Sequence, residues 1–363
     1  MTPKFCNSLS NEINFTLDTV KPCGWFRAKT MPVTVESLNK LKEYAASSDW
    51  IPECSHCYNL ESKQIKSPRN RANDNRLGIF SNSDEVGVPK RVDFQIDTDC
   101  NAACLMCSTH FSSTWRKYTE NHIIDANEIN KRDTNTFDDR LDIILSNIDL
   151  SNVQLVKISG GEPFKNDLHL KILEKIENLK NLTLIYVSNG SYLPNQKTLD
   201  VWKKCKKIEI YFSIDGIEIH FNYLRWPLQW SRVSNNLKYL SNLDIDNMQI
   251  GTSFALTPFN IYYVDRYKSW AHTFFKDSKN TDPKYWFIEP FVSSGVINLS
   301  CITPSLRTAI QEKYGESHEL YKLIPDFNRE AYEKFINYVS LHDLKRSHDW
   351  RIIFPEIVPY INT

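Results

Sequence analysis

Short hydrophobic runs alternate with helical patterns from residue 91 onward. Six of these runs have the length and composition of buried strands, namely residues 92–96, 153–158, 182–187, 208–214, 248–256 and 285–291. Between them lie stretches that suit helices with one buried face, namely residues 168–179, 197–204, 232–240 and 261–275. Alternation of this kind predicts βαβ units and a parallel sheet.

This order of elements predicts an α/β fold, a partial (β/α)6 open barrel over residues 91–300, because right-handed crossovers would curl six such units round. Chemistry in such barrels gathers at the C-terminal ends of the strands. Residues 1–90 are rich in Asn, Ser, Pro and Lys, so we expect a small N-terminal cysteine-rich module and a connector there. Residues 301–363, with one helical pattern near 328–341, are expected to form a C-terminal helical extension.

Charge and hydropathy narrow the class of protein. The 44 Lys and Arg residues balance the 44 Asp and Glu residues, which argues against a globally basic nucleic-acid binder. No stretch has the length and apolar content of a membrane-spanning helix, and residues 1–6 lack the apolar core of a signal peptide. We therefore expect a cytoplasmic protein that does not engage a membrane and has no clear nucleic-acid footprint.

Three of the nine cysteines form a C-x3-C-x2-C triplet directly after the first predicted strand: Cys100, Cys104 and Cys107. In a reducing cytosol, clustered cysteines more often bind metal than form disulfides. Three thiolates can hold three corners of a four-iron cluster and leave the fourth iron open to a substrate or cosubstrate. The spacing therefore indicates catalysis rather than electron storage alone.

A second motif follows the second predicted strand, where Gly160, Gly161 and Glu162 precede a proline. Paired glycines let a ligand approach the backbone closely, and the carboxylate beside them can hold an ammonium group. Alone, such a turn is usually only a strand-to-helix loop. Here the turn lies one βαβ unit after the cysteine triplet, and this position indicates a ligand site.

Together these motifs resemble the radical S-adenosylmethionine (radical SAM) superfamily over roughly residues 91–300. Two more signatures follow in order, Val-Ser-Asn-Gly at 187–190 and Phe-Ser-Ile-Asp-Gly at 212–216. The resemblance implies that SAM chelates the open iron of a [4Fe–4S] cluster and is cleaved reductively to a 5′-deoxyadenosyl radical, which abstracts hydrogen from a substrate. It also implies that Gly160, Gly161 and Glu162 bind the amino group of SAM.

The resemblance assigns four further residues to the cofactor. Asn189 and Ser213 would lie near the ribose or carboxylate of SAM, and Arg225 would pair with that carboxylate or steady its neighbours. Residues of these types at strand ends also cap turns, so a purely structural role is the alternative. Met106 stands where the superfamily often has an aromatic residue, and its thioether can still pack against an adenine ring.

The N-terminal module has a second cysteine group, Cys6, Cys23, Cys54 and Cys57, which ends in a C-x2-C pair. Four cysteines complete the ligand set of either a zinc ion or an iron–sulfur cluster. The group, with Trp50 before its last pair, resembles the auxiliary-cluster modules called twitch and SPASM domains, although those usually follow the barrel. The resemblance favours an auxiliary iron–sulfur cluster over zinc, for electron transfer or structural support.

An auxiliary cluster suits a net oxidation, because it can accept the electron left on the substrate radical. The first hypothesis is thus an oxidoreductase-like radical SAM enzyme that oxidises or cross-links a peptide or protein side chain, with a flavodoxin or ferredoxin as electron donor. An alternative is a dehydrogenase or rearrangement enzyme acting on a small molecule, such as an amino sugar or nucleotide. The other alternative is a non-catalytic zinc or iron–sulfur protein that binds a partner or senses redox state.

Overall fold

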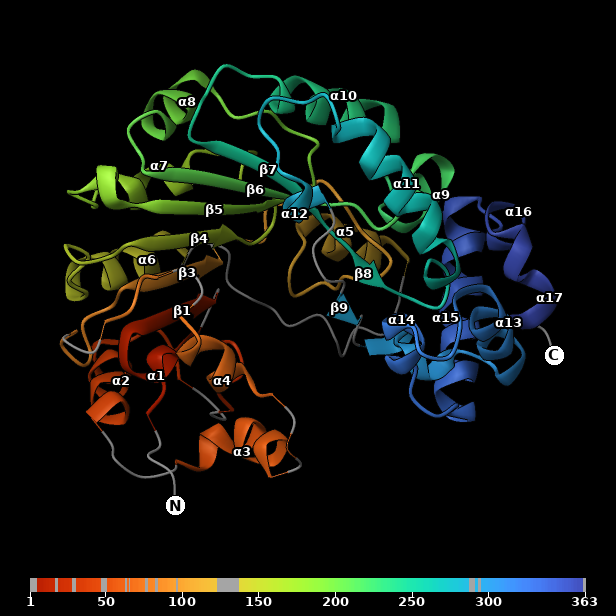
Figure 1. Cartoon of the computed structure of the whole chain (residues 1–363), viewed down its shortest axis with the longest axis horizontal. Helices are drawn as coiled ribbons and strands as arrows, with labels where there is room; N and C mark the ends of the chain where they lie inside the picture. The colour runs from red at the N-terminus through yellow and green to blue at the C-terminus, as the bar shows by residue number, and fades with distance from the viewer. Residues whose placement is uncertain are drawn as a thin grey trace. The chain divides into compact units, whose positions relative to one another are not determined.

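The computed structural model describes residues 5–16, 19–27, 31–46, 51–62, 64, 66–75, 78–81, 84–95, 97–122, 137–286, 291–292 and 295–361. Its framework is a seven-stranded sheet with strand order β2-β1-β3-β4-β5-β6-β7 (Figure 1). From β1 to β7 the bounds are Glu12–Thr16, Thr19–Lys21, Arg91–Gln95, Leu155–Ser159, Thr183–Ser188, Lys207–Ser213 and Met248–Ser253. The sheet is mostly parallel and open, which confirms the predicted α/β fold with a partial barrel.

Parallel pairing joins β1 to β3, β3 to β4 and β4 to β5, whereas β2 pairs antiparallel with β1. The register sets Val92 opposite Val156 and Phe94 opposite Ile158, and all four side chains are buried. Near-continuous apolar runs are typical of parallel strands that are covered on both faces. This is why the hydrophobic runs of the sequence locate the strands.

One predicted strand is divided and another is wrong over part of its length. Residues 248–256 form β7 and then β8 (Ala255–Leu256), which pairs in parallel with β9 (Phe291–Val292). The start of the predicted strand 285–291 is instead the end of helix α12 (Pro283–Trp286). The proline fixes φ at the helix start, and the Asp282 side chain accepts a hydrogen bond from the Lys284 amide at 3.0 Å. Residues 287–290 of this prediction, and residue 96 of the first one, lie outside the described residues.

The predicted helix 168–179 is shorter in the structure. Helix α7 (Leu168–Leu173) ends early because the amides of Lys175 and Ile176 bond to the carbonyls three residues back, not four. The three other predicted helices correspond to α8 (Gln196–Trp202), α10 (Trp230–Ser241) and α11 (Val264–Phe275), the last preceded by a 3₁₀ turn.

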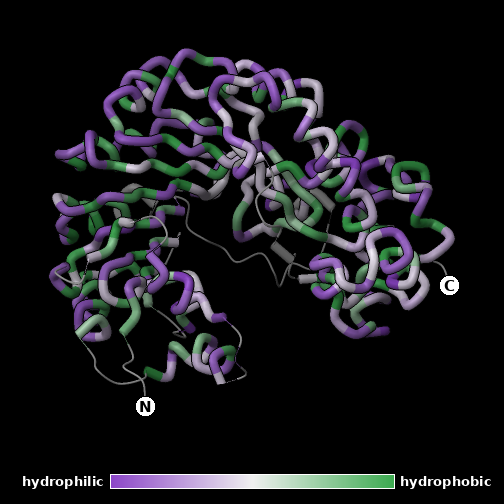
Figure 2. Tube along the Cα trace, viewed as in Figure 1, coloured by the Kyte–Doolittle hydropathy of each residue, from purple (hydrophilic) through white to green (hydrophobic). Residues whose placement is uncertain are grey.

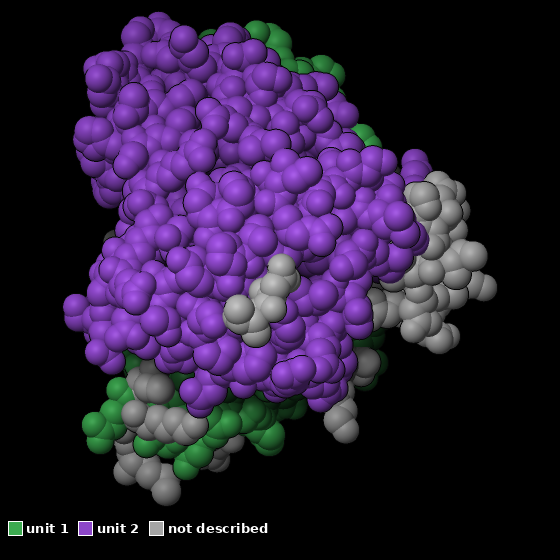
Figure 3. Space-filling view, turned by 90° about the vertical axis from the view of Figure 1, so that its right-hand side faces the viewer, with its two compact units in different colours: residues 1–98, 131–187, 194–209 green, residues 99–130, 188–193, 210–363 purple. Residues whose placement is uncertain are grey.

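The chain forms two compact units (Figure 3). Unit 1 comprises Met1–Thr98, Lys131–Val187 and Pro194–Glu209, and unit 2 comprises Asp99–Asn130, Ser188–Leu193 and Ile210–Thr363. The division into residues 1–90, 91–300 and 301–363 stays a prediction.

The N-terminal part of unit 1 holds more regular structure than its polar sequence indicates. Besides β1 and β2 it contains helices α1 (Asn7–Asn11), α2 (Val35–Ala46), α3 (Ser55–Glu61) and α4 (Pro68–Asn73). Strand β2, helix α2 and the loop between them form a core of Val20, Phe26, Met31, Leu38 and Leu41, against which Cys23 and Cys54 pack. Helix α6 (Phe137–Asn147) also belongs to this unit.

Unit 2 contains helices α5 (Ser113–His122) and α9 (Glu218–Leu224) and a C-terminal group of helices. The latter are α13 (Pro304–Tyr314), α14 (Glu319–Lys322), α15 (Arg329–Arg346), α16 (Trp350–Ile353) and α17 (Val358–Ile361). The helix predicted near 328–341 is α15. Along the helices, hydrophobic and hydrophilic residues alternate, as elements with one buried face require (Figure 2). Within the described ranges, no helix combines the length and apolarity needed to cross a membrane.

Candidate metal centres and cofactor site

The cysteine triplet lies on the loop between β3 and α5. Cys100 and Cys104 are buried, and Cys107 is half-buried. Backbone hydrogen bonds fix the loop within unit 2, because the amides of Ala103 and Leu105 donate to the carbonyls of Trp226 and Leu224, both at 2.7 Å. A loop tied by its backbone can present several side chains to one ligand with little loss of order on binding.

The polar stretch after the triplet supports the loop through its carbonyl oxygens. Thr114 Oγ1 donates to the carbonyl of Cys100 at 2.6 Å, and Ser112 Oγ donates to that of Ala102 at 2.6 Å. Trp115 Nε1 donates to the carbonyl of Cys104 at 2.8 Å. The first turn of α5 therefore positions the triplet from its C-terminal side, a role that spacing alone did not indicate.

Two of the triplet sulfurs have nitrogen donors beside them. Asn189 Nδ2 lies 3.7 Å from Cys100 Sγ, and a guanidinium nitrogen of Arg225 lies 3.7 Å from Cys104 Sγ. Burial raises the pKa of the Cys104 thiol, while Arg225 opposes the rise. Burial also raises the pKa of Cys107 to about 12, so an incoming metal would have to displace protons from these thiols.

Arg225 is itself held by Asp215, which the sequence motif contains but to which no role was assigned. The guanidinium lies 2.6 Å from Asp215 Oδ2, and Asp215 Oδ1 accepts a hydrogen bond from the Ala255 amide at 2.7 Å. Burial raises the pKa of the Asp215 carboxyl, whereas the charge of Arg225 lowers it. The pair keeps a cation buried beside Cys104 at a fixed position.

Of the remaining unit 2 residues of the predicted cofactor site, Asn189 and Ser213 lie at strand ends and Met106 lies in the triplet loop. Asn189 also donates to Asn101 Oδ1 at 3.1 Å, and its own Oδ1 accepts from the Ser191 amide at 2.9 Å. Ser213 is the half-buried last residue of β6, and Met106 is half-buried in the turn between Cys104 and Cys107. The structure thus brings Asn189 and Arg225 to the triplet.

Gly160, Gly161 and Glu162 belong to unit 1 and follow β4. Gly160 has φ 133°, which a residue with a side chain rarely adopts, so this position requires glycine. The Gly161 amide donates to the Asp97 carbonyl at 2.9 Å. Glu162 is fully buried, and its Oε1 accepts from the Phe164 amide at 3.3 Å. The turn therefore has a defined shape with a buried carboxylate.

A histidine that the sequence analysis did not single out holds this turn. His169 Nδ1 donates to the Pro163 carbonyl at 3.0 Å, and its Nε2 lies 3.1 Å from Thr198 Oγ1. Burial lowers the pKa of His169 to about 4, so the ring is neutral at physiological pH. Its role is structural, because both ring nitrogens face protein partners.

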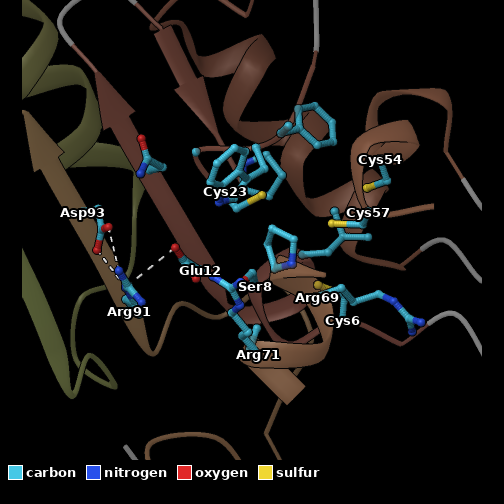
Figure 4. A pocket seen from close by; sticks show the side chains of 18 of the residues that line it. Cys6, Ser8, Glu12, Cys23, Cys54, Cys57, Arg69, Arg71, Arg91 and Asp93 are labelled. Atoms are coloured by element: carbon cyan, nitrogen blue, oxygen red, sulfur yellow. Dashed lines mark hydrogen bonds and ion pairs between the residues drawn. The ribbon is translucent and has the colours of Figure 1, made fainter. Parts of the chain in front are cut away.

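The four N-terminal cysteines line one cavity of about 390 Å³ in unit 1 (Figure 4). Cys6 precedes α1, Cys23 follows β2, and Cys54 and Cys57 lie at the start of α3. Burial raises the pKa of Cys6 to about 11 and those of Cys23 and Cys54 to about 12. Trp50, which contributed to the resemblance to auxiliary-cluster modules, lies outside the described residues.

Charged side chains line the other walls of this cavity. Arg91 lies 2.8 Å from Asp93 Oδ2 and 3.7 Å from Glu12 Oε1, as the dashed lines of Figure 4 mark. Burial raises the pKa of Glu12 to about 7, although Arg91 opposes the rise. Arg69 and Arg71 of α4 complete the lining. The cavity therefore combines four thiols with a partly neutralised set of charges.

Across the described residues of both units, no group of three or more His, Cys, Asp or Glu side chains is arranged to hold a single metal ion.

No protein-family model matches the sequence, and no curated protein sequence matches it significantly. Solved structures that are similar to it include anSMEcpe with bound AdoMet, at 16% identity and a TM-score of 0.37, covering 71% of this chain and 62% of that one. SuiB of Streptococcus suis bound to precursor peptide SuiA is 14% identical with a TM-score of 0.36, and the match covers 84% and 64% of the two chains. TYW1 with a lysine-pyruvate adduct is 16% identical with a TM-score of 0.28, covering 60% and 76%.

These neighbours are radical SAM enzymes. The present chain spans less than two thirds of the length of the first two, at 62% and 64%. At these identities and TM-scores the likeness carries no argument about the reaction, which is inferred below from the chain's own residues.

Proposed function

We propose that this chain is a radical SAM enzyme in which Cys100, Cys104 and Cys107 hold a [4Fe–4S] cluster. The observation that carries the proposal is the donor environment of the triplet, with Asn189 Nδ2 and Arg225 each 3.7 Å from a cysteine sulfur. A four-iron cluster held by three thiolates is anionic, so buried donors and a buried cation beside its ligands suit it. Thiols that only pack in the core would need neither the buried hydrogen-bond donors nor the buried cation.

Bound SAM and cluster would supply reductive cleavage of the sulfonium to a 5′-deoxyadenosyl radical, and the chain supplies binding and orientation. Gly160 and Gly161 let the amino acid part of SAM approach the backbone, and the buried Glu162 carboxylate pairs with its amino group. Met106 packs against the adenine. These roles fit the fixed turn geometry after β4 and the position of Met106 within the triplet loop.

Two roles can be refined from the contacts. Arg225 already pairs with Asp215 and reaches Cys104 Sγ, which favours steadying the cluster ligands over pairing with the SAM carboxylate. Asn189 contacts Cys100 Sγ, so it too supports the cluster as well as facing the ribose or carboxylate. Ser213, at the end of β6, is assigned to the same part of the cofactor.

For the N-terminal quartet, Cys6, Cys23, Cys54 and Cys57, we propose an auxiliary iron–sulfur cluster of the twitch or SPASM kind, with zinc as the alternative. The cavity supports a cluster, because about 390 Å³ is far more space than one ion with tetrahedral ligands needs. With all four irons ligated by protein, the site would serve electron transfer or structure rather than substrate binding.

The reaction proposed is a net oxidation or cross-link of a peptide or protein side chain, oxidoreductase-like, with the auxiliary cluster accepting the electron. The protein would act in the cytoplasm with a flavodoxin or ferredoxin as donor. A small-molecule dehydrogenase or rearrangement reaction is the alternative substrate class. A non-catalytic zinc or iron–sulfur protein would explain the cysteines but not the fixed glycine turn with its buried carboxylate.

The test is release of 5′-deoxyadenosine from SAM by the anaerobically reconstituted protein under a strong reductant. We expect release by the wild-type protein and complete loss in Cys104→Ala, because the cluster loses a ligand. Cys301→Ala is the matched control, since Cys301 is also a buried thiol of unit 2 and donates to the backbone carbonyls of Val296 and Ala331. Equal release by Cys104→Ala and wild type would refute the assignment of the triplet.

A further inference from the structure

One face of helix α15, in the C-terminal group of helices, supports the triplet loop. Tyr338 Oη donates to the Leu105 carbonyl at 2.9 Å, and Arg346 donates to the Ala103 carbonyl at 3.0 Å. His342, midway between them, contacts Tyr118 Oη through Nδ1 at 2.8 Å. Residues four apart lie on the same side of a helix, so these three form a continuous support.

Arg346 is the charged member of this face and is almost fully buried, at 8% exposure. Its guanidinium lies over the rings of Trp226, Tyr118 and Trp115, at 4.8, 5.0 and 5.6 Å from their centroids. Cation–π contacts of this kind hold a desolvated guanidinium in place. Trp115 in turn donates to the Cys104 carbonyl. The cation is thus fixed against the loop that carries the triplet.

Among the described residues, no ion pair joins Arg346 to a carboxylate. In the described part of the chain no Asp or Glu oxygen lies within ion-pair distance of the guanidinium, and its Nε is buried without a hydrogen-bond partner. Arg225, by contrast, pairs with Asp215 at 2.6 Å. A buried cation without a counter-ion is costly, so an anion is expected nearby. Because Arg346 donates to the carbonyl of Ala103, the residue directly before Cys104, its guanidinium lies beside the loop that carries the triplet.

We propose that Arg346 is a positioning residue for the triplet cluster, whose hydrogen bond fixes the loop and whose buried charge raises the reduction potential of the cluster. This inference rests on the proposed function. One-electron reduction makes the cluster more negative by one charge. A nearby buried cation therefore stabilises the reduced form more than the oxidised form, and the potential becomes less negative.

The experiment is a redox titration of the reconstituted protein, monitored by electron paramagnetic resonance (EPR). The signal to monitor is the one that changes when SAM is added, because that response identifies the cluster with an open iron. We expect Arg346→Gln to shift its potential to a more negative value. Arg346→Lys keeps the charge and should retain most of the wild-type potential. Lys334→Gln is the control, because it removes a charge from the same helix at a solvent-exposed ion pair.

An unchanged potential in Arg346→Gln would overturn the inference, and so would equal shifts in Arg346→Gln and Arg346→Lys, which would point to packing alone. If Arg346→Gln fails to bind iron, Arg346→Met replaces it, since Met retains much of the aliphatic stem. Absence of any SAM-responsive signal in the wild-type protein would instead reject the proposed function and this inference with it.

Discussion

Two buried guanidinium groups lie near the cysteine triplet, and their charges are balanced differently. Arg225 has a carboxylate partner in Asp215, which is anchored by the amide of Ala255. The Arg346 guanidinium instead packs against aromatic rings and donates a hydrogen bond to the Ala103 carbonyl. Asp215 therefore fixes the position of one cation, whereas the other depends on packing. Removing Asp215 should leave Arg225 as an uncompensated buried charge.

We expect Asp215→Asn to lower the free energy of unfolding by about 3–5 kcal/mol, the usual cost of removing one partner from a buried ion pair. Denaturant unfolding of the apoprotein measures this loss. Asp244→Asn is the matched control, since Asp244 is 94% exposed and lies 4.0 Å from Lys279, a pair that contributes little. A change in Asp215→Asn no larger than in the control would show that the pair does not stabilise the fold.

At the residue scale, the sequence identifies groups that lie near one another in the chain or in a known motif order. The cysteine triplet and the turn at 160–162 are of this kind, and their assigned roles stay predictions. The contact between Arg346 and Ala103 joins residues 243 positions apart, which no local pattern encodes. A weak signal did exist, because Tyr338, His342 and Arg346 recur every four residues along α15.

At the element scale, helix α4 shows how a polar segment can be well ordered. Ser67 and Asn70 form a capping box, and Pro68 occupies the first turn. The Ser67 hydroxyl accepts from the Asn70 amide at 3.1 Å and donates to Glu61 at 2.5 Å. Because α4 supplies Pro68, Arg69, Arg71 and Ala72 to the lining of the quartet cavity, its start affects that site.

Ser67→Ala should cost about 0.5–2 kcal/mol of stability, because the capping hydrogen bonds at the start of α4 are lost. Thermal or denaturant unfolding detects the change, and iron retained by the quartet should fall with it. Ser62→Ala provides the comparison, as Ser62 is exposed and its hydroxyl donates to the nearby Asn59 carbonyl. Equal stability of the two variants would contradict the capping role.

Helix α4 also shows which elements cannot be predicted from local composition. The stretch 67–76 has the composition of a connector. Ser followed by Pro is also a signal for the start of a helix, and residues 68–73 do form helix α4. Strand β1 is similar, since Glu12–Thr16 is short and alternates polar with apolar residues, yet it pairs with β3. The apolar runs of β4 to β6 were predictable because each of these strands buries several large side chains in the core.

At the scale of the whole molecule, the two cysteine groups belong to different compact units, the quartet to unit 1 and the triplet to unit 2. Each unit has its own hydrophobic cluster near its cysteines, with Val20 and Phe26 in one and Ala103 and Trp115 in the other. Loss of one proposed metal site should therefore leave the other proposed site able to form. Cys54→Ala/Cys57→Ala provides a background in which the triplet can be observed alone.

The most direct measurement is the EPR spectrum of the dithionite-reduced, reconstituted protein with and without SAM, in the wild type and in Cys54→Ala/Cys57→Ala. We expect a four-iron signal that changes on adding SAM and persists in the double variant, because Cys100, Cys104 and Cys107 leave one iron open. A second, SAM-insensitive signal lost in the double variant would identify the quartet as the auxiliary cluster. A wild-type spectrum that does not respond to SAM would contradict the proposal that the triplet holds a cluster with an open iron.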